Sequence, residues 1–539
     1  MNRQEQISKL QTTKEFDICI IGAGATGAGI ALDAALRGLK VVLIDKSDFA
    51  GQTSSKSTKL IHGGVRYLEQ AVKKLDWEQY KMVRKSLRER ETLLKNAPHL
   101  SSPLALLTPC FNIIEGIYYT IGMKMYEWIS GSANMPKSAW LSKKETLDRI
   151  PELKSKRLSS GVLYYDGQMD DARYCLALVQ SAEAKGVVVL NRTEALKFSK
   201  NEDNGRLKSL NIKDLMTDNE LVINAKVFIN ATGPFADSIR QMASSKLKPR
   251  IKVSRGAHVV LPREVMKGDT AILVPKTDDG RVIFMIPWQD QVLIGTTDEA
   301  DELSENPKLE DYEKTYLLEY VNRYFEKTVT PDQIKSGFAG LRPLLQAQLQ
   351  TAMNSDTKSL VRDHEVEIDR RTKLVSIMGG KWTTYRLMAK DTLDEVYKEV
   401  LKKEIVECTS ENQILHGGEN YRFEDWQGLV NKYKISEFTA QHLMKKYGSK
   451  AVNVLQLTDN QSDLKALLSP NHPFIKAEVV YAIQEEMATT VDDVLERRLG
   501  LKLRDEVASR MVEPYVSQLL SEYKNEHTHS NKSSKTTSF

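Results

Sequence analysis

The sequence predicts an α/β protein in which a discontinuous, Rossmann-like domain carries an inserted antiparallel sheet and is followed by an all-helical domain. Three observations predict this fold class. Residues 16–45 read as an apolar strand, a glycine turn, a helix and a second apolar strand that ends in an acid, which is how a βαβ unit begins. Short apolar runs between 251 and 297 are separated by turn-rich spacers, as in an antiparallel sheet. Residues 400–523 alternate helical patterns with glycine and proline breakers.

The composition excludes several classes of protein. The chain has 539 residues, of which 41% are apolar, and its 29 glycines and 16 prolines are too few for a collagen-like or low-complexity protein. The 77 basic and 72 acidic side chains leave a net charge of only +5, which gives no indication of nucleic-acid binding. The four cysteines form no CxxC pair, and His527 and His529 lie in a polar tail, so we expect neither a metal site nor a disulfide framework. The N-terminus has no apolar stretch that could serve as a signal peptide.

The first glycine turn carries the strongest local motif. Gly22, Gly24 and Gly27 fit the pattern G-x-G-x-x-G, in which glycines permit a tight turn, the close approach of a pyrophosphate and close packing of helix on strand. Asp45 stands 23 positions after Gly22, where a carboxylate accepts hydrogen bonds from an adenosine ribose and repels a 2′-phosphate. The turn therefore predicts a dinucleotide other than NADP, although FAD and NAD share this fingerprint.

Three later segments favour FAD over NAD. Residues 53–68 are too polar for the next helix of a plain NAD domain, and residues 227–237 run from a strand into an Ala-Thr-Gly turn. Residues 375–388 continue from a strand into two glycines, a lysine and a helix N-terminus, which suits the negative charge of a reduced flavin. A site assembled from both ends of the chain fits FAD in an extended pose. The predicted cofactor-binding residues are Gly22, Gly24, Gly27, Asp45, Ser54, Ser57, Lys59, Leu60, His62, Thr232, Gly233, Gly380, Lys381 and Thr383.

A series of motifs occurs in one order along the chain. The glycine-turn unit is followed by TSSKSTKLIHGGVRYLE, INATGP, RGAHVVLP, IGTTD, GLRPL, VRDH and MGGKWTTYR. Together they resemble the FAD-dependent glycerol-3-phosphate dehydrogenases of the quinone-linked type. The resemblance covers residues 14–520 and includes the stretch AEVVYAIQEEMATTVDDVLERRLGL, at 477–501, which is similar to the helical C-terminal domain of that family.

The resemblance implies a specific reaction. It is the oxidation of sn-glycerol 3-phosphate to dihydroxyacetone phosphate by hydride transfer to flavin N5, with the electrons passed on to a membrane quinone. Two alternatives keep the same cofactor fingerprint: an oxygen-using glycerol-3-phosphate oxidase, and an FAD-dependent amine or amino-acid oxidase, which would bind a carboxylate with one arginine. A non-catalytic flavin protein would hold FAD without its reduction by either kind of substrate.

The motifs and their order also predict how the chain divides into domains. The C-terminal helices are expected to cap the molecule or to support the contacts of a homodimer. We expect an FAD-binding domain at 14–95, 160–250 and 340–398, a substrate-binding domain at 96–159 and 251–339, a helical domain at 400–523, and a disordered polar tail at 524–539.

Oxidation of a phosphorylated secondary alcohol needs cations for the phosphate and a base for the hydroxyl proton. His62, in a glycine turn beside the cofactor segment, and His258, on a predicted pocket strand, are the two candidates for the base. Lys381 is expected to stabilise the alkoxide or the reduced flavin, and Arg342 to act in catalysis as well as in binding. The expected substrate-binding residues are Arg66, Tyr67, Arg342 and Arg362.

Residues 109–129 form the most apolar segment of the chain. Glu115, Lys124 and Glu127 argue against a membrane span, because a charge at the bilayer centre costs about 2.5–3.5 kcal/mol. Apolar residues recur every three or four positions from Phe111 to Trp128, so we expect an amphipathic helix that faces the core, or lies in a membrane interface, or lines a quinone entrance. Residues 56–95 hold eleven basic and five acidic side chains, which favours peripheral attachment to an anionic membrane. The predicted location is cytoplasmic, on the inner face of the cell membrane.

Overall fold

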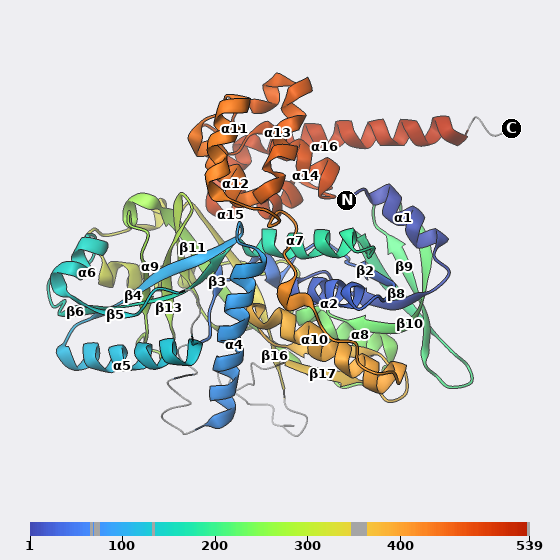
Figure 1. Cartoon of the computed structure of the whole chain (residues 1–539), viewed down its shortest axis with the longest axis horizontal. Helices are drawn as coiled ribbons and strands as arrows, with labels where there is room; N and C mark the ends of the chain where they lie inside the picture. The colour runs from blue at the N-terminus through green and yellow to red at the C-terminus, as the bar shows by residue number, and fades with distance from the viewer. Residues whose placement is uncertain (65–67, 69–75, 132–134, 347–363, 536–539) are drawn as a thin grey trace.

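Two sheets lie next to each other beneath a helical C-terminal part (Figure 1). The computed structural model describes residues 1–64, 68, 76–131, 135–346 and 364–535. The two sheets supply the walls of the candidate site, and the helical part lies above them in the view of Figure 1.

The first sheet confirms the Rossmann-like prediction. Its strands follow the order β17-β18-β10-β1-β2-β7, and β9 extends it by pairing with β10 and β8. Because the strands from β18 to β7 run parallel, their carboxyl ends meet at one edge, where an open α/β sheet binds its ligand. The strands are β1 (Phe16–Ile21), β2 (Val41–Ile44), β7 (Val188–Leu190), β8 (Thr193–Lys200), β9 (Leu207–Asp214), β10 (Glu220–Asn230), β17 (His364–Ile368) and β18 (Val375–Gly379).

Helices cover both faces of this sheet, which explains why β2 is apolar throughout and buried. One face packs against α2, α7 and α10, and the other against α1 and α8. The helices are α1 (Arg3–Thr12), α2 (Ala25–Leu36), α7 (Asp171–Ala184), α8 (Ala236–Ala243) and α10 (Tyr385–Glu395).

The second sheet is antiparallel except that β12 pairs with β4 in parallel. Its order is β15-β11-β14-β13-β12-β4-β6-β3, with β16 on β11 and β5 on β6. The helices α6 (Lys143–Arg149) and α9 (Asp311–Tyr324) accompany it. The strands are β3 (Leu60–Ile61), β4 (Ser101–Cys110), β5 (Ala139–Ser142), β6 (Ser160–Met169), β11 (Ile251–Pro262), β12 (Ala271–Val274), β13 (Ile283–Trp288), β14 (Gln291–Gly295), β15 (Glu299–Asp301) and β16 (Ser336–Leu345).

The second sheet includes two strands from segments that we expect to belong to the FAD-binding domain. β6 opens the segment 160–250 that we assigned to the FAD-binding domain, yet it pairs over its whole length with β4. The end of β16 opens the segment 340–398, yet this strand pairs with β11 from Ser336 to Leu345. Both strands join the second sheet because an antiparallel ladder satisfies their backbone hydrogen bonds there.

The C-terminal part is helical, as predicted, with two apolar cores of its own. Within the segment 524–539, where we expect a disordered tail, α16 continues to Lys535 (Figure 1); extending a helix that is already nucleated costs little per residue. The elements are α11 (Trp426–Tyr433), α12 (Glu437–Tyr447), α13 (Ala451–Asn460), α14 (Lys476–Glu485), the short helix η12 (Asp493–Arg498), α15 (Leu501–Arg504) and α16 (Glu506–Lys535).

Two further helices, α4 (Trp77–Asn96) and α5 (Ile113–Ser130), pack against each other. The expected amphipathic helix forms, but its large apolar side chains face outward: Ile114 is 80% exposed and Trp128 is 78% exposed. Gly116, Met123 and Tyr126 are the buried residues of α5. The core-facing interpretation of this stripe is therefore wrong. Over the part of the chain that the structure describes, we find no helix with the length and apolar character needed to cross a membrane.

Candidate functional site

A cavity of about 1800 Å³ lies between the two sheets, and the residues that line it range from Ile21 to Met388. The first sheet contributes the turns after β1, β2, β10 and β18, and the second contributes β11 and β16. Of the predicted cofactor and catalytic residues, those on the cavity wall are Gly22, Gly24, Asp45, Ser54, Ser57, Leu60, His62, Thr232, Gly233, His258, Arg342, Gly380, Lys381 and Thr383.

The glycine turn after β1 leaves no room for side chains. Gly22 has φ +103°, and a Cβ there would lie 2.7 Å from the carbonyl oxygen of Ala231 in the neighbouring turn. A Cβ at Gly27 would collide with the carbonyl oxygen of Gly22, so this glycine packs helix α2 on the turn, as predicted. The N-terminus of α2 opens on the cavity, where Ser54 Oγ accepts a hydrogen bond from the Ala25 amide at 3.0 Å. This arrangement suits the pyrophosphate of a dinucleotide.

Asp45 lies on the cavity wall and is also tied to the backbone around it. It accepts hydrogen bonds from the amides of Ala23 at 2.7 Å and Ser47 at 2.8 Å. Burial raises the pKa of Asp45 despite these hydrogen bonds. A carboxylate has about four acceptor positions, so Asp45 can still accept a hydrogen bond from a ribose hydroxyl.

In the polar segment after β2, Lys59 is not among the residues that line the cavity. Its ammonium is buried and donates to Asp171 Oδ1 at 2.5 Å and to the Ser55 carbonyl at 2.6 Å. Ser57 lines the cavity, but its hydroxyl also donates to Asp171, at 2.7 Å. The Lys59 ammonium therefore fixes the fold of this segment, because a buried cation needs an anionic partner, and a contact between Lys59 and the cofactor stays a prediction. No sequence pattern links Lys59 to an aspartate more than a hundred positions away.

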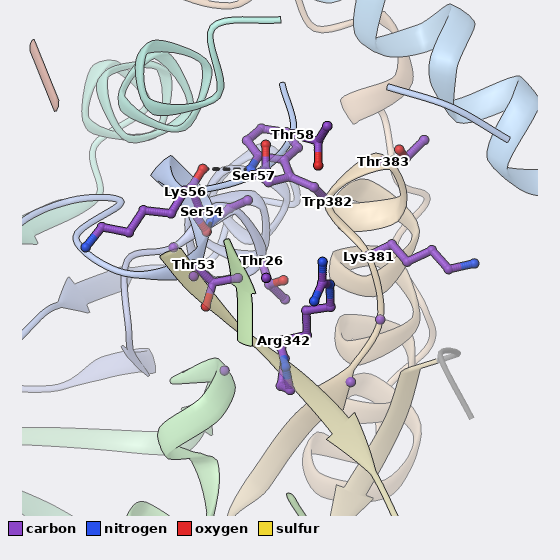
Figure 2. Close-up of a pocket in the computed structure, with 18 of the residues that line it drawn as sticks. Thr26, Thr53, Ser54, Lys56, Ser57, Thr58, Arg342, Lys381, Trp382 and Thr383 are labelled. Atoms are coloured by element: carbon purple, nitrogen blue, oxygen red, sulfur yellow. Dashed lines mark hydrogen bonds between the residues drawn. The ribbon is translucent and has the colours of Figure 1, made fainter. Parts of the chain in front are cut away.

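The turn after β18 lies beside the polar segment after β2 on the cavity wall (Figure 2). Thr383 Oγ1 accepts a hydrogen bond from the His62 amide at 3.4 Å, and Trp382 Nε1 donates to the Ser54 carbonyl at 2.9 Å. The Lys381 side chain points away from Arg342 in Figure 2, and its Nζ lies 3.4 Å from Met82 Sδ. These contacts join segments from both ends of the chain, as the extended FAD pose requires.

Arg342 lies on β16 with its guanidinium against Gly256 of the neighbouring strand, where any Cβ would collide with it. Its Nη2 donates to Thr296 Oγ1 at 3.0 Å and to the Thr297 carbonyl at 3.1 Å, and Nη1 lies 3.5 Å from Asp298 Oδ1. Figure 2 shows this side chain in the middle of the pocket. The arrangement holds a cation on the cavity wall, where it suits an anionic substrate.

The two histidines proposed as the base both line the cavity. His258 is 2% exposed, its ring stacks on Phe338, and its Nε2 lies 3.0 Å from Thr58 Oγ1. Burial, followed by the charges of Arg342 and Lys59, lowers the pKa of His258 well below its ordinary value. His258 is therefore neutral near pH 7 and able to accept a proton. Three other predicted residues, Arg66, Tyr67 and Arg362, lie outside the residues that the structure describes.

Sequence reasoning missed several polar residues of the site. Thr296 and Asp298 hold the Arg342 guanidinium, and Thr58 contacts His258. Thr296 and Asp298 could have been predicted, because the motif IGTTD places three polar residues directly after an apolar strand. Asp166 also lines the cavity, and it accepts a hydrogen bond from the buried Tyr126 hydroxyl at 2.9 Å. Within the described ranges, no three His, Cys, Asp or Glu side chains gather into a group that could hold a metal ion.

Two family models match the chain. One, described as FAD dependent oxidoreductase, matches residues 17–360, and the other, described as the C-terminal domain of alpha-glycerophosphate oxidase, matches residues 408–530. The chain is 39% identical over 525 residues to a probable mitochondrial glycerol-3-phosphate dehydrogenase of Caenorhabditis elegans, an alignment that covers 96% of this chain and 72% of the relative. It is 38% identical over 526 residues to the mitochondrial glycerol-3-phosphate dehydrogenase of Homo sapiens, with 95% and 72% covered.

Solved structures give a similar result. The X-ray structure of the glycerol-3-phosphate dehydrogenase from Bacillus halodurans complexed with FAD superposes with a TM-score of 0.77 and 28% identity, and it covers 97% of this chain and 93% of that chain. The L-alpha-glycerophosphate oxidase from Mycoplasma pneumoniae with FAD bound has a TM-score of 0.55 at 18% identity and covers 74% of this chain and 98% of that chain. The second likeness concerns the fold alone.

Proposed function

The chain belongs to the FAD-dependent glycerol-3-phosphate dehydrogenases, within the FAD dependent oxidoreductase family, and on that premise we propose that it oxidises sn-glycerol 3-phosphate to dihydroxyacetone phosphate and delivers the electrons to a membrane quinone. FAD is its cofactor. The observation that carries the proposal is the position of a cationic side chain and a neutral histidine on the wall of the same cavity as the glycine turn.

The residues of the cavity fit FAD in both shape and charge. The pyrophosphate would lie at the turn of Gly22 and the N-terminus of α2, with Asp45 toward the ribose. The turn of Gly380 and Thr383 would hold the other half of the cofactor. When bound, FAD supplies the two-electron acceptor that takes hydride from the carbinol carbon of the substrate.

Arg342 is our candidate for the phosphate ligand. Asp298 and Thr296 orient its guanidinium, so the side chain loses little freedom when a phosphate binds. A guanidinium matches the geometry of two phosphate oxygens. Lys381 stays a candidate for stabilising negative charge near the cofactor, and Arg66, Tyr67 and Arg362 stay predictions for the same phosphate.

His258 is the better supported of the two candidate bases. Its neutral imidazole, with Nε2 toward Thr58 Oγ1, can accept the hydroxyl proton of the substrate at that nitrogen as the hydride leaves. His62 is the alternative, since it lies on the same cavity and its amide contacts Thr383.

Anaerobic reduction of the bound flavin tests the reaction. We expect glycerol 3-phosphate to bleach the oxidised flavin absorbance of the holoenzyme. We expect glycerol at the same concentration to bleach it far more slowly, and amino acids to leave it unchanged. Bleaching by amino acids instead would favour an amine or amino-acid oxidase. A flavin that no substrate reduces would favour the non-catalytic alternative.

The cavity extends beyond the predicted cofactor contacts toward α5, where Tyr118, Ile121 and Met125 line it. An apolar path of this kind suits a hydrophobic electron acceptor. Stopped-flow reoxidation of the reduced holoenzyme tests the acceptor: we expect a short-chain quinone to reoxidise the flavin much faster than oxygen. Faster reoxidation by oxygen would make the protein a glycerol-3-phosphate oxidase.

We also propose that α5 attaches the protein peripherally to the inner face of the cell membrane, on the cytoplasmic side. Ile114, Ile117 and Trp128 are 80%, 50% and 78% exposed, and such a face is stabilised when it enters a membrane interface. Sedimentation with anionic vesicles tests this, and we expect Ile114→Glu to weaken binding. Ile405→Glu is the control, because Ile405 is 52% exposed but is not part of α5; it lies between the short helices η7 (Val396–Leu401) and η8 (Ser410–Asn412). Equal binding by the two variants would contradict the proposal.

The homodimer expected from the C-terminal helices is part of the same proposal. Analytical ultracentrifugation of the holoenzyme in detergent tests it, with the dimer mass as the expected result. A monomer at all protein concentrations would contradict it.

A further inference from the structure

The C-terminal segment 477–501, which the family resemblance included, has no part in the function proposed above. The residues that line the cavity end at Met388, so none of this segment reaches it within the described part of the chain. Its short helix η12 nevertheless packs against α7 of the first sheet's helical layer. Its other contacts reach the loop after β2, which carries Asp45.

The main contact is a buried cluster formed by Asp48, Arg497 and Arg498, called the Asp48 cluster below. Asp48 Oδ2 accepts from Arg497 Nε at 2.7 Å and from Arg498 Nη1 at 2.6 Å, and Oδ1 accepts from Arg498 Nη2 at 2.9 Å. Asp48 and Arg498 are 0% and 1% exposed. Burial alone would raise the pKa of Asp48, but the charges of the two arginines outweigh it and hold the pKa far below its ordinary value. The cluster is therefore ionised, and both carboxylate oxygens of Asp48 accept hydrogen bonds from arginine.

The Asp48 cluster acts on a loop that forms part of the cofactor site. Asp48 stands three residues after Asp45, and the cavity wall includes Asp45, Lys46, Ser47 and Gly51 from this loop. Arg498 donates hydrogen bonds to both carboxylate oxygens of Asp48. This bidentate contact fixes the orientation of the loop as well as its position. Asp48 itself does not line the cavity.

Two more ion pairs connect η12 to the same side of the cavity. Arg192, on the cavity wall, donates to Asp493 at 2.5 Å, and Asp493 is completely buried. Lys56, also on the wall, lies 3.7 Å from Glu496. One short helix of the C-terminal part thus pairs with three segments that contribute residues to the cavity wall.

We infer that η12 is a positioning element for FAD: the Asp48 cluster holds the loop that carries Asp45 in its binding conformation, so FAD affinity depends on the docking of the C-terminal helical part. Linkage requires the reverse effect as well, because a ligand that binds better to the docked state stabilises docking to the same degree. Binding couplings of this kind usually change affinity by about 5- to 150-fold.

FAD release from the holoenzyme tests the inference. Arg498→Gln keeps much of the side-chain volume but removes the charge, and we expect it to raise the FAD dissociation constant by about 5- to 150-fold, measured by the recovery of flavin fluorescence on dilution. Arg498→Lys restores the charge without the paired hydrogen bonds, so its affinity for FAD should lie between that of the unaltered chain and that of Arg498→Gln. At saturating FAD, the KM for glycerol 3-phosphate should be unchanged, because Arg342 and His258 do not contact the cluster. A loss of kcat and a rise in KM with no change in FAD affinity would overturn the inference.

Arg504→Gln is the matched control. Arg504 is 1% exposed and also joins the C-terminal part to the rest of the chain, through Asp290 at 2.9 Å, but that residue lies between β13 and β14 and is not on the cavity wall. We expect Arg504→Gln to lower thermal stability and to leave FAD affinity unchanged. An equal loss of FAD affinity in both variants would contradict a specific role for the Asp48 cluster.

Hydrogen exchange of the unaltered chain gives a result even where Arg498→Gln fails to fold. We expect the amides from Asp493 to Arg498 to exchange more slowly in the holoenzyme than after removal of FAD, although these residues do not touch the cavity. Equal exchange rates with and without FAD would refute the coupling. This outcome is independent of the proposed reaction, since it requires no substrate.

Discussion

Replacing Arg342 with alanine tests the phosphate ligand directly. The Arg342 side chain is 27% exposed, and the position of its guanidinium against Gly256 is fixed by contacts with Thr296 and Asp298. The substitution removes the cation and leaves space on the cavity wall, but it removes no residue of the glycine turn. We therefore expect the loss to fall on the phosphate of the substrate, with FAD binding unaffected.

The magnitude follows from the hydrogen bonds that a guanidinium can donate to a phosphate. A charge-assisted hydrogen bond contributes about 1.5–3 kcal/mol, and partial exposure of Arg342 places each of two such bonds at the low end of that range. Together they amount to about 3 kcal/mol, which corresponds to a loss of about 100-fold in kcat/KM. Arg342→Lys should recover part of this loss, because it restores the charge but only one donor group.

Steady-state kinetics with glycerol 3-phosphate and with glycerol provide the assay. Arg342→Ala should lower kcat/KM for the phosphorylated substrate and change the low activity on glycerol little. The control is Arg263→Ala, because Arg263 is similarly exposed, at 23%, and paired with Asp269, but it is not on the cavity wall. Near-normal kinetics of Arg342→Ala with glycerol 3-phosphate would refute the assignment, and an equal loss in the control would show that the effect is not specific.

Three further predictions concern proton transfer and stability. Because burial and nearby cations lower the pKa of His258 well below its ordinary value, anaerobic flavin reduction should keep its rate down to pH values well below 6.5, and His258→Ala should slow it by about 100- to 10,000-fold; an unchanged rate would make His62 the base. Burial raises the pKa of Asp166 from 3.8 to about 6 despite its arginine partner, so the folded state binds its proton more tightly and the free energy of unfolding should fall as pH rises from about 4 to about 6. Urea denaturation of Asp166→Asn should show a smaller fall over that range, and an identical pH profile would contradict the shift. Lys59→Met leaves the buried Asp171 without its cation and should cost about 3–5 kcal/mol of unfolding free energy, measured by denaturant titration; a loss below about 1 kcal/mol would show that the ion pair contributes little.

Several features of this protein were predictable because they depend on residues close together in the chain. The turn at Gly22 has no space for a Cβ, so glycine is required there and the sequence shows it. The turn at Gly380 is recognised in the same way, from two glycines that precede a helix. The segment 111–128 forms a helix because its apolar residues recur at helical spacing. Arg342 and His258 were identified as site residues from the motifs that contain them, and both lie on the cavity wall.

Other features required the tertiary structure. The periodicity of α5 gave an apolar face but not what that face contacts, and Ile114 turns out to face outward. The ion pair of Lys59 with Asp171 joins residues that are distant in the sequence.

The sequence alone thus determined the dinucleotide fingerprint, the types of secondary structure and most candidate site residues, because glycine turns and apolar periodicity act over a few positions. Only the tertiary structure decided which strands share a sheet, how Arg342 is held by Asp298, and that Arg498 pairs with Asp48 from 450 positions away. The physical reason is that a buried charge is stabilised by whichever partner the packed fold brings within hydrogen-bond distance, and local sequence patterns do not record that partner.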